Sequence, residues 1–297
     1  MRRNSLRTGR NSNIFRPRLE SLEGRLCLSV TVTTIAVDSG NELKIVGDSG
    51  ADVVNITDQG DGHVDVTNGK GKILGSADNV SVIRFNGKDG KDTVSYALAN
   101  PLTTTEQVIL NLGDGGKDQA SIDLSQGVSG ANLHLTVNGG AGADTVSATL
   151  GSISAGKVIL DVNGGDGKDA ISVTGSGITI SDDSVLRLNL AGDTGADTIA
   201  TVIDGLVLGK LVYNATGGQG TDTVSANITA DSASTGTLRA VERGGPGVDN
   251  VTLNVIDNSG GAGSSTLAAL HATIFDESGL DTLTHTDNVT IKPAPTV

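Results

Sequence analysis

The chain has 297 residues, with 42 glycines, one cysteine, two tyrosines, three phenylalanines and no tryptophan. The single cysteine excludes an internal disulfide framework, and so few aromatic side chains exclude an ordinary globular core. Residues 1–30 carry seven arginines and two glutamates, whereas the remaining 267 residues carry 14 basic and 32 acidic side chains. Such an acidic body repels nucleic acid and anionic membranes and attracts cations, so we expect no nucleic-acid partner.

Residues 1–30 are rich in arginine, serine and asparagine and show no hydrophobic period, which predicts a disordered basic segment. Within them, residues 18–29 read RLESLEGRLCLS and resemble the LEPR-XLL-type N-terminal segment, except that Cys27 stands where leucine is usual. The resemblance implies a sorting segment and export to the cell surface or beyond. No stretch approaches the ~20 apolar residues of a membrane span.

One motif, Gly-x-x-Gly-x-Asp, then recurs eight times, beginning with Gly47–Asp52. The first interval between successive aspartates is 40 residues and the others are 25 to 28, and a degenerate ninth copy ends at Asp281. The seven later complete copies end at Asp92, Asp118, Asp144, Asp169, Asp197, Asp222 and Asp249. Regular spacing of this kind is typical of a repeat architecture.

Apolar and small polar residues alternate on both sides of each motif, which is the mark of a strand with one buried face. After the loop the apolar positions include Val94, Val146 and Ile171, and before it they include Leu133, Leu135 and Val137. A unit of about 26 residues cannot bury its apolar face alone, but stacked units form a continuous core. Residues 31–297 are therefore predicted to form one all-β domain, a parallel β-solenoid of about eight coils.

Two other architectures fit less well. An α/β fold needs helical patterns of 10–15 residues between the strands, and the sequence has none. A β-sandwich leaves identical turns at near-identical intervals unexplained. In the solenoid, Ser95, Ser121, Ser147 and Ser172 are expected to stack outside, while Val94, Val146, Ile171, Ile199, Val224 and Val251 are expected to stack inside.

The loops allow two interpretations. In the first, the glycines permit a sharp corner and each aspartate accepts local backbone hydrogen bonds, with no ligand. In the second, carboxylates stacked ~4.8 Å apart repel one another, and a divalent cation held between successive loops relieves the repulsion. Carboxylate and carbonyl oxygens are the hard ligands that calcium takes.

Several loops resemble the RTX, or haemolysin-type, calcium-binding repeat, written Gly-Gly-x-Gly-x-Asp-x-U-x with U apolar. Residues 139–147, 164–172 and 217–225 match all nine positions of this repeat, and residues 244–251 match its first eight. The resemblance implies calcium held between neighbouring loops by the seven later aspartates and by glycines of the fully matching copies, namely Gly139, Gly140, Gly142, Gly164, Gly165, Gly167, Gly217, Gly218 and Gly220.

This chain departs from the RTX pattern in two ways. It has one loop per long coil, whereas the family pattern places loops on both edges. Asp48, Lys88, Asp114 and Asp193 replace the second glycine in four copies, and the loop lysines favour the metal-free interpretation.

No catalytic triad, Cys/His dyad or phosphate-binding loop is recognisable, and the four histidines are scattered. His134 is expected on a solvated outer strand face. We therefore expect a calcium-binding, non-catalytic, exported protein whose partners are calcium ions and cell-surface or matrix components. The alternatives are a metal-free structural or adhesive solenoid and, less favoured, a polysaccharide lyase or hydrolase on a parallel β-helix.

Overall fold

The computed structural model describes residues 30–207, 209–259, 266–276, 281–286 and 289–293. The predicted sorting segment, apart from Val30, lies outside these residues, as does its export motif, and both stay predictions. The described chain is all-β and contains no helix. It therefore contains no helix suited to crossing a membrane.

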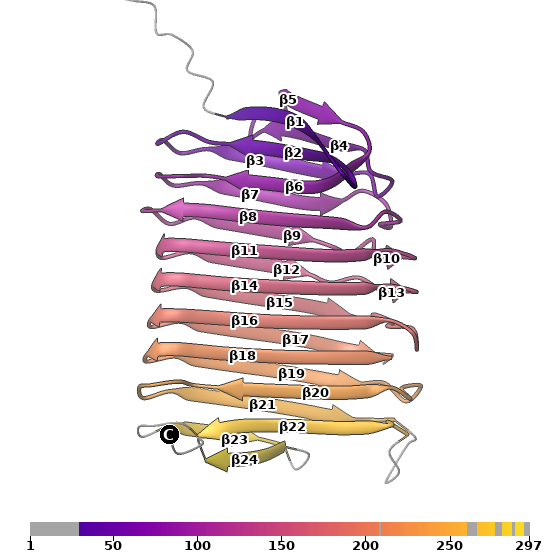
Figure 1. The fold of residues 1–297 in the computed structure, drawn as a ribbon. Helices are drawn as coiled ribbons and strands as arrows, with labels where there is room; N and C mark the ends of the chain where they lie inside the picture. Colours follow the sequence, from indigo (N-terminus) through magenta and orange to yellow (C-terminus); the bar gives the residue numbers. More distant parts are fainter. Residues whose placement is uncertain (1–29, 208, 260–265, 277–280, 287–288, 294–297) are drawn as a thin grey trace, which may run out of the picture.

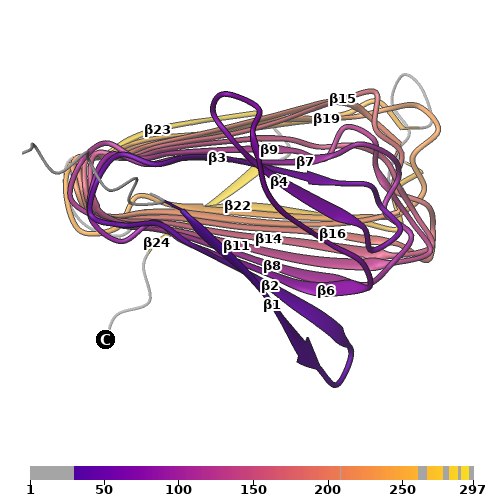
Figure 2. The same cartoon turned by 90° about the horizontal axis from the view of Figure 1, so that it is seen from above.

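Two facing eleven-stranded sheets make up the solenoid (Figures 1 and 2). Sheet A consists of β1 (Thr31–Val37), β2 (Gly40–Val46), β6 (Val80–Asn86), β8 (Glu106–Asp114), β11 (Asn132–Gly142), β14 (Lys157–Gly167), β16 (Val185–Gly195), β18 (Lys210–Gly220), β20 (Thr237–Arg243), β22 (Ala269–Asp276) and β24 (Val289–Pro293). Sheet B consists of β3 (Val53–Asp58), β4 (Val64–Asn68), β5 (Ile73–Ala77), β7 (Thr93–Leu98), β9 (Gln119–Asp123), β12 (Thr145–Thr149), β15 (Ala170–Ser176), β17 (Thr198–Leu206), β19 (Thr223–Ala230), β21 (Asn250–Asp257) and β23 (Thr282–His285).

The register between coils places equivalent residues above one another. Val146 pairs with Ala120 on one side and with Ile171 on the other, and the same column continues through Ile199, Val224 and Val251. All six side chains are buried. The predicted inner column is therefore confirmed, and Ser121, Ser147 and Ser172 form the predicted outer column beside it.

The N-terminal end of the stack departs from this pattern. β1 pairs antiparallel with β2, and β3, β4 and β5 form an antiparallel meander. The two extra strands β4 and β5 explain why the first interval, from Asp52 to Asp92, is longer than the others. About six regular turns result, fewer than the eight predicted.

The two sheets meet through the Gly-Asp loops at one edge and through return segments at the other (Figure 2). A short parallel ladder joins β10 (Val128–Ser129) to β13 (Ile153–Ser154) in these return segments. The ladder continues as an isolated bridge from Ile153 to Ile180. The Gly-Asp edge is thus a row of stacked corners, and it carries the predicted site.

Candidate functional site: the aspartate column

The aspartates that end the loops form one column, and each is hydrogen-bonded to the next. The backbone N–H of each donates to Oδ1 of the aspartate in the following coil over 2.7–2.9 Å. The column runs without a break through Asp52, Asp92, Asp118, Asp144, Asp169, Asp197, Asp222, Asp249 and Asp281. The predicted single column is therefore confirmed, and its members bridge coils directly.

The carboxylates of this column are buried. The exposed fraction of the side chains from Asp52 to Asp249 is at most 3%. Burial raises the pKa of Asp92 and of Asp197 to about 6, although the N–H that each accepts from the preceding coil lowers it. Neighbouring carboxylates of the column raise both pKa values further. Burial is also the main reason that the pKa values of Asp118, Asp144, Asp169 and Asp222 are raised.

The first glycine of each loop makes room for the second carboxylate oxygen. A Cβ at Gly139 would lie 2.9 Å from Oδ2 of Asp144, and one at Gly164 would lie 2.5 Å from Oδ2 of Asp169. Gly217 stands in the same relation to Asp222, at 2.6 Å. The Oδ2 atoms of Asp92, Asp118, Asp144, Asp169, Asp197 and Asp222 are buried and accept no hydrogen bond. All of these except the Oδ2 of Asp118 face a glycine Cα, a setting for weak Cα–H···O contacts.

The other predicted glycines have structural roles at the same corner. Gly165 has φ +100°, and Gly140 and Gly218 share this left-handed region. Gly167 has φ +138°, and its Cα approaches the carbonyl of Gly142 in the preceding coil so closely that a Cβ would overlap that oxygen. Gly220 meets the carbonyl of Gly195 in the same way, and Gly142 that of Gly116. These contacts hold successive corners in register.

One loop is built differently from its sequence match. Gly113 pairs with Gly140, the second residue of the next loop. The motif assigned Gly113 to the first position of its own loop, but this pairing places it at the second position. Buried Leu112 takes the first position, and Gly115 is an extra residue with no neighbour near its would-be Cβ. The loop before Asp118 is therefore one residue longer than the sequence pattern indicated.

Calcium takes six to eight oxygen ligands, so a site needs several oxygens directed at one point. In the column, Oδ1 accepts a backbone N–H, and in most coils Oδ2 faces a glycine. Within the described ranges, no three carboxyl, imidazole or thiol groups gather closely enough to hold a metal ion. The predicted metal ligands are brought together as a column, with one carboxylate per coil.

Sequence reasoning missed a carboxyl pair inside the solenoid near its N-terminal end. Tyr96 donates to Oδ2 of Asp58 over 2.6 Å, and the N–H of Gly60 donates to Oδ1 over 2.8 Å. Burial, and then a hydrogen bond with Asp58, raise the pKa of Glu106 to about 9. This pair lies at the return edge, at the end of β3 and the start of β8.

A second buried carboxyl lies near the C-terminal end, where Tyr213 donates to Oε1 of Glu242 over 3.0 Å. Burial raises the pKa of Glu242 to about 8, and the hydrogen bond from Tyr213 partly offsets this rise. A signal for both sites was present in the sequence. Asp58 follows Val54 and Ile56, and Glu242 follows Leu238 and Ala240, so the alternation assigns each carboxyl to the inner face.

Comparisons of the chain with protein-family models, with curated proteins and with solved structures gave no match.

Proposed function

We propose that the chain is a non-catalytic structural solenoid of a cell surface or extracellular matrix, with its coils fastened by the aspartate column. The unbroken series of N–H to Oδ1 hydrogen bonds carries this proposal. Hydrogen bonds from N–H groups to charged acceptors contribute about 1.5–3 kcal/mol each, and they recur here at every corner. Export rests on the resemblance of residues 18–29.

The column supports a structural role because its polar groups are already engaged. Asp144 donates its N–H to Asp169, its Oδ1 accepts the N–H of Asp118, and its carbonyl accepts the N–H of Ala170. One residue is therefore hydrogen-bonded to the coils on both sides, through its side chain to one and through its backbone to the other. A residue in this position has no group left to present to a substrate except the buried Oδ2.

Calcium binding is the second candidate, and one observation favours it. The six Oδ2 atoms named above are buried and accept no hydrogen bond, which is costly for an ionised carboxylate. A cation reaching them would remove that cost. It would need backbone carbonyls and water to complete its coordination, and the loops would have to open to admit it.

The two candidates are separated by thermal unfolding in chelator and in millimolar calcium, with magnesium as the control ion. The scaffold proposal expects the same melting temperature in all three conditions. Calcium bound only to the folded stack would add ~2.7 kcal/mol per site at a hundredfold excess over its dissociation constant. A rise specific to calcium, absent when Asp144 and Asp169 are both replaced by asparagine, would replace the scaffold proposal with the calcium one.

A further inference from the structure

The outer face of sheet A is basic, although the protein as a whole is acidic. From β14 to β20, its solvent-accessible positions carry Lys157, Arg187, Lys210, Arg239 and Arg243 against three acidic side chains, Asp161, Asp166 and Asp193. The strands of sheet B carry no lysine or arginine at all. Neither Arg187 nor Arg239 forms an ion pair with another described residue. Positive charge is thus concentrated on one face.

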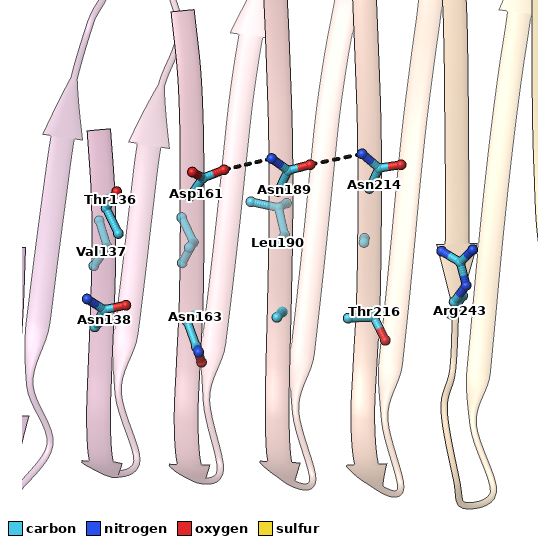
Figure 3. Close-up of a pocket in the computed structure, with 13 residues that line it drawn as sticks. Thr136, Val137, Asn138, Asp161, Asn163, Asn189, Leu190, Asn214, Thr216 and Arg243 are labelled. Carbon is cyan, nitrogen blue, oxygen red and sulfur yellow. Dashed lines mark hydrogen bonds between the residues drawn. The ribbon is translucent and has the colours of Figure 1, made fainter. Parts of the chain in front are cut away.

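A groove of about 270 Å³ runs across this face, parallel to the solenoid axis (Figure 3). One wall is the row Asp161, Asn189 and Asn214, contributed by β14, β16 and β18. The other wall is the row Asn163, Ala191 and Thr216 from the same three strands, and Arg243 of β20 lies at its end. Because the first row follows the coil repeat, it offers a carboxyl or amide group every ~4.8 Å.

Hydrogen bonds between strands fix the first wall. Nδ2 of Asn189 donates to Asp161 over 2.6 Å, Nδ2 of Asn214 donates to Asn189 over 2.9 Å, and Nη1 of Arg239 donates to Asn214 over 2.9 Å. His134 pairs with Oδ2 of Asp161 over 2.7 Å. Each amide uses one of its two N–H groups in this row, so the second is available to a ligand.

The charges at the groove suit an anion. Asp161 is paired with His134 and accepts from Asn189, which reduces its repulsion of a bound anion. The guanidinium of Arg243 lies 4.4 Å from the centre of the Phe275 ring, a cation–π contact that holds it at the groove end. Arginine so held binds carboxylates or sulfates with little further loss of side-chain entropy.

We propose that this groove binds a linear acidic polysaccharide, whose chain lies along the solenoid axis with its anionic groups at Arg239 and Arg243. Repeating hydroxyls match the repeating amides of the wall, and one or two carboxylates or sulfates match the arginines, which both belong to β20. Nucleic acid fits less well, because the groove has no aromatic platform for bases and most of the protein surface is acidic. The proposal gives the surface or matrix role a partner, and it does not involve the aspartate column.

Direct binding to the full chain tests the proposal, in chelator so that calcium links no carboxylates. The probes are polygalacturonate and a sulfated galactan, with neutral dextran and double-stranded DNA as comparisons. We expect binding to at least one acidic polysaccharide, none to dextran, and weaker binding to DNA. Replacing Arg239 and Arg243 together by glutamine should weaken binding roughly tenfold or more. The matched control, Lys117→Gln with Lys168→Gln, removes two charges from the loop edge and should change binding less than about twofold.

A second variant separates the groove from general charge attraction. Ala191→Phe fills the groove from its wall without altering charge, and it should abolish most binding while the melting temperature stays near that of the wild type. Equal losses in the arginine variant and the lysine control would overturn the proposal. So would wild-type binding by a folded Ala191→Phe protein, or DNA bound as tightly as the polysaccharides. The melting temperatures measured in chelator and in calcium do not depend on this groove, so they test the scaffold proposal separately.

Discussion

The backbone N–H of Asp144 donates to Oδ1 of Asp169, one coil further along the stack, over 2.7 Å. This bond joins the corner between β11 and β12 to the corner between β14 and β15, where the strand ladders of the two sheets are interrupted. A side chain thus supplies an acceptor that the backbone does not provide there. Because the relationship recurs in every coil, the column continues the inter-coil hydrogen bonding around the edge of the solenoid.

Replacing Asp169 by alanine should destabilise the protein by about 1–3 kcal/mol, because the buried N–H of Asp144 loses its acceptor. Asp169→Asn retains an oxygen at this position and removes a buried charge, so it should change stability by less than about 1 kcal/mol. Denaturant unfolding checks both. Asp204→Ala, at an exposed outer position of β17, is the control, and a loss equal to that of Asp169→Ala would contradict the role assigned to the column.

The stability cost of an introduced charge should distinguish the inner positions of the stack from the outer ones. Ile171→Asp puts an unpaired carboxylate into the inner column and should cost several kcal/mol, whereas Ser172→Asp lies outside and should cost far less. Melting temperatures of the two variants provide the comparison. Similar values would mean that the assignment of inner and outer positions is incorrect.

The close approach of successive corners predicts a large effect for one glycine. Gly167→Ala introduces a methyl group that overlaps the carbonyl of Gly142, so we expect a loss of several kcal/mol. Gly115 also has a positive φ, +80°, but nothing lies near its would-be Cβ. Gly115→Ala should therefore cost only the ~1–2 kcal/mol of the left-handed backbone. Equal losses on unfolding would rule out corner contact as the reason for the glycine.

The buried carboxyl of Glu242 predicts a pH dependence of stability. Its pKa is raised from 4.5 to about 8, so between these values the folded state holds a proton that the unfolded state has released. Stability should then fall by about 1.4 kcal/mol per pH unit across this window, being greatest at the acidic end.

Glu242→Gln should remove this contribution and raise stability more at pH 7 than at pH 5. Unfolding curves at the two pH values measure the difference. A variant that gains the same amount at both would show that Glu242 is not buried as a neutral acid.

The sequence predicted the solenoid well because its signals are local and repeated. The alternation around Val146 and Ile171 determined the inner face, and the constant intervals placed the aspartates in one column. The N-terminal cap was not predicted, because Val64–Asn68 and Ile73–Ala77 alternate like any other strands and nothing local specifies their antiparallel pairing.

The candidate site was predicted in position and not in detail. A motif shows that Asp169 ends a loop, but only the stack shows that its Oδ1 lies beside the N–H of Asp144 and that its Oδ2 is buried. The extra residue Gly115 was hidden because Gly113 satisfies the motif by itself. The groove of sheet A was missed because Asp161, Asn189 and Asn214 are separated by whole coils in the sequence.

Hydrogen exchange at the amide of Asp144 tests the aspartate column most directly. The account predicts strong protection in the wild type and in Asp169→Asn, and exchange at least roughly tenfold faster in Asp169→Ala, a factor that corresponds to 1.4 kcal/mol. The amide of Asp222, whose acceptor is Asp249, should keep its wild-type rate in both variants. An Asp144 amide that exchanges freely in the wild type, or at an unchanged rate in Asp169→Ala, would contradict the claim that these carboxylates fasten the coils.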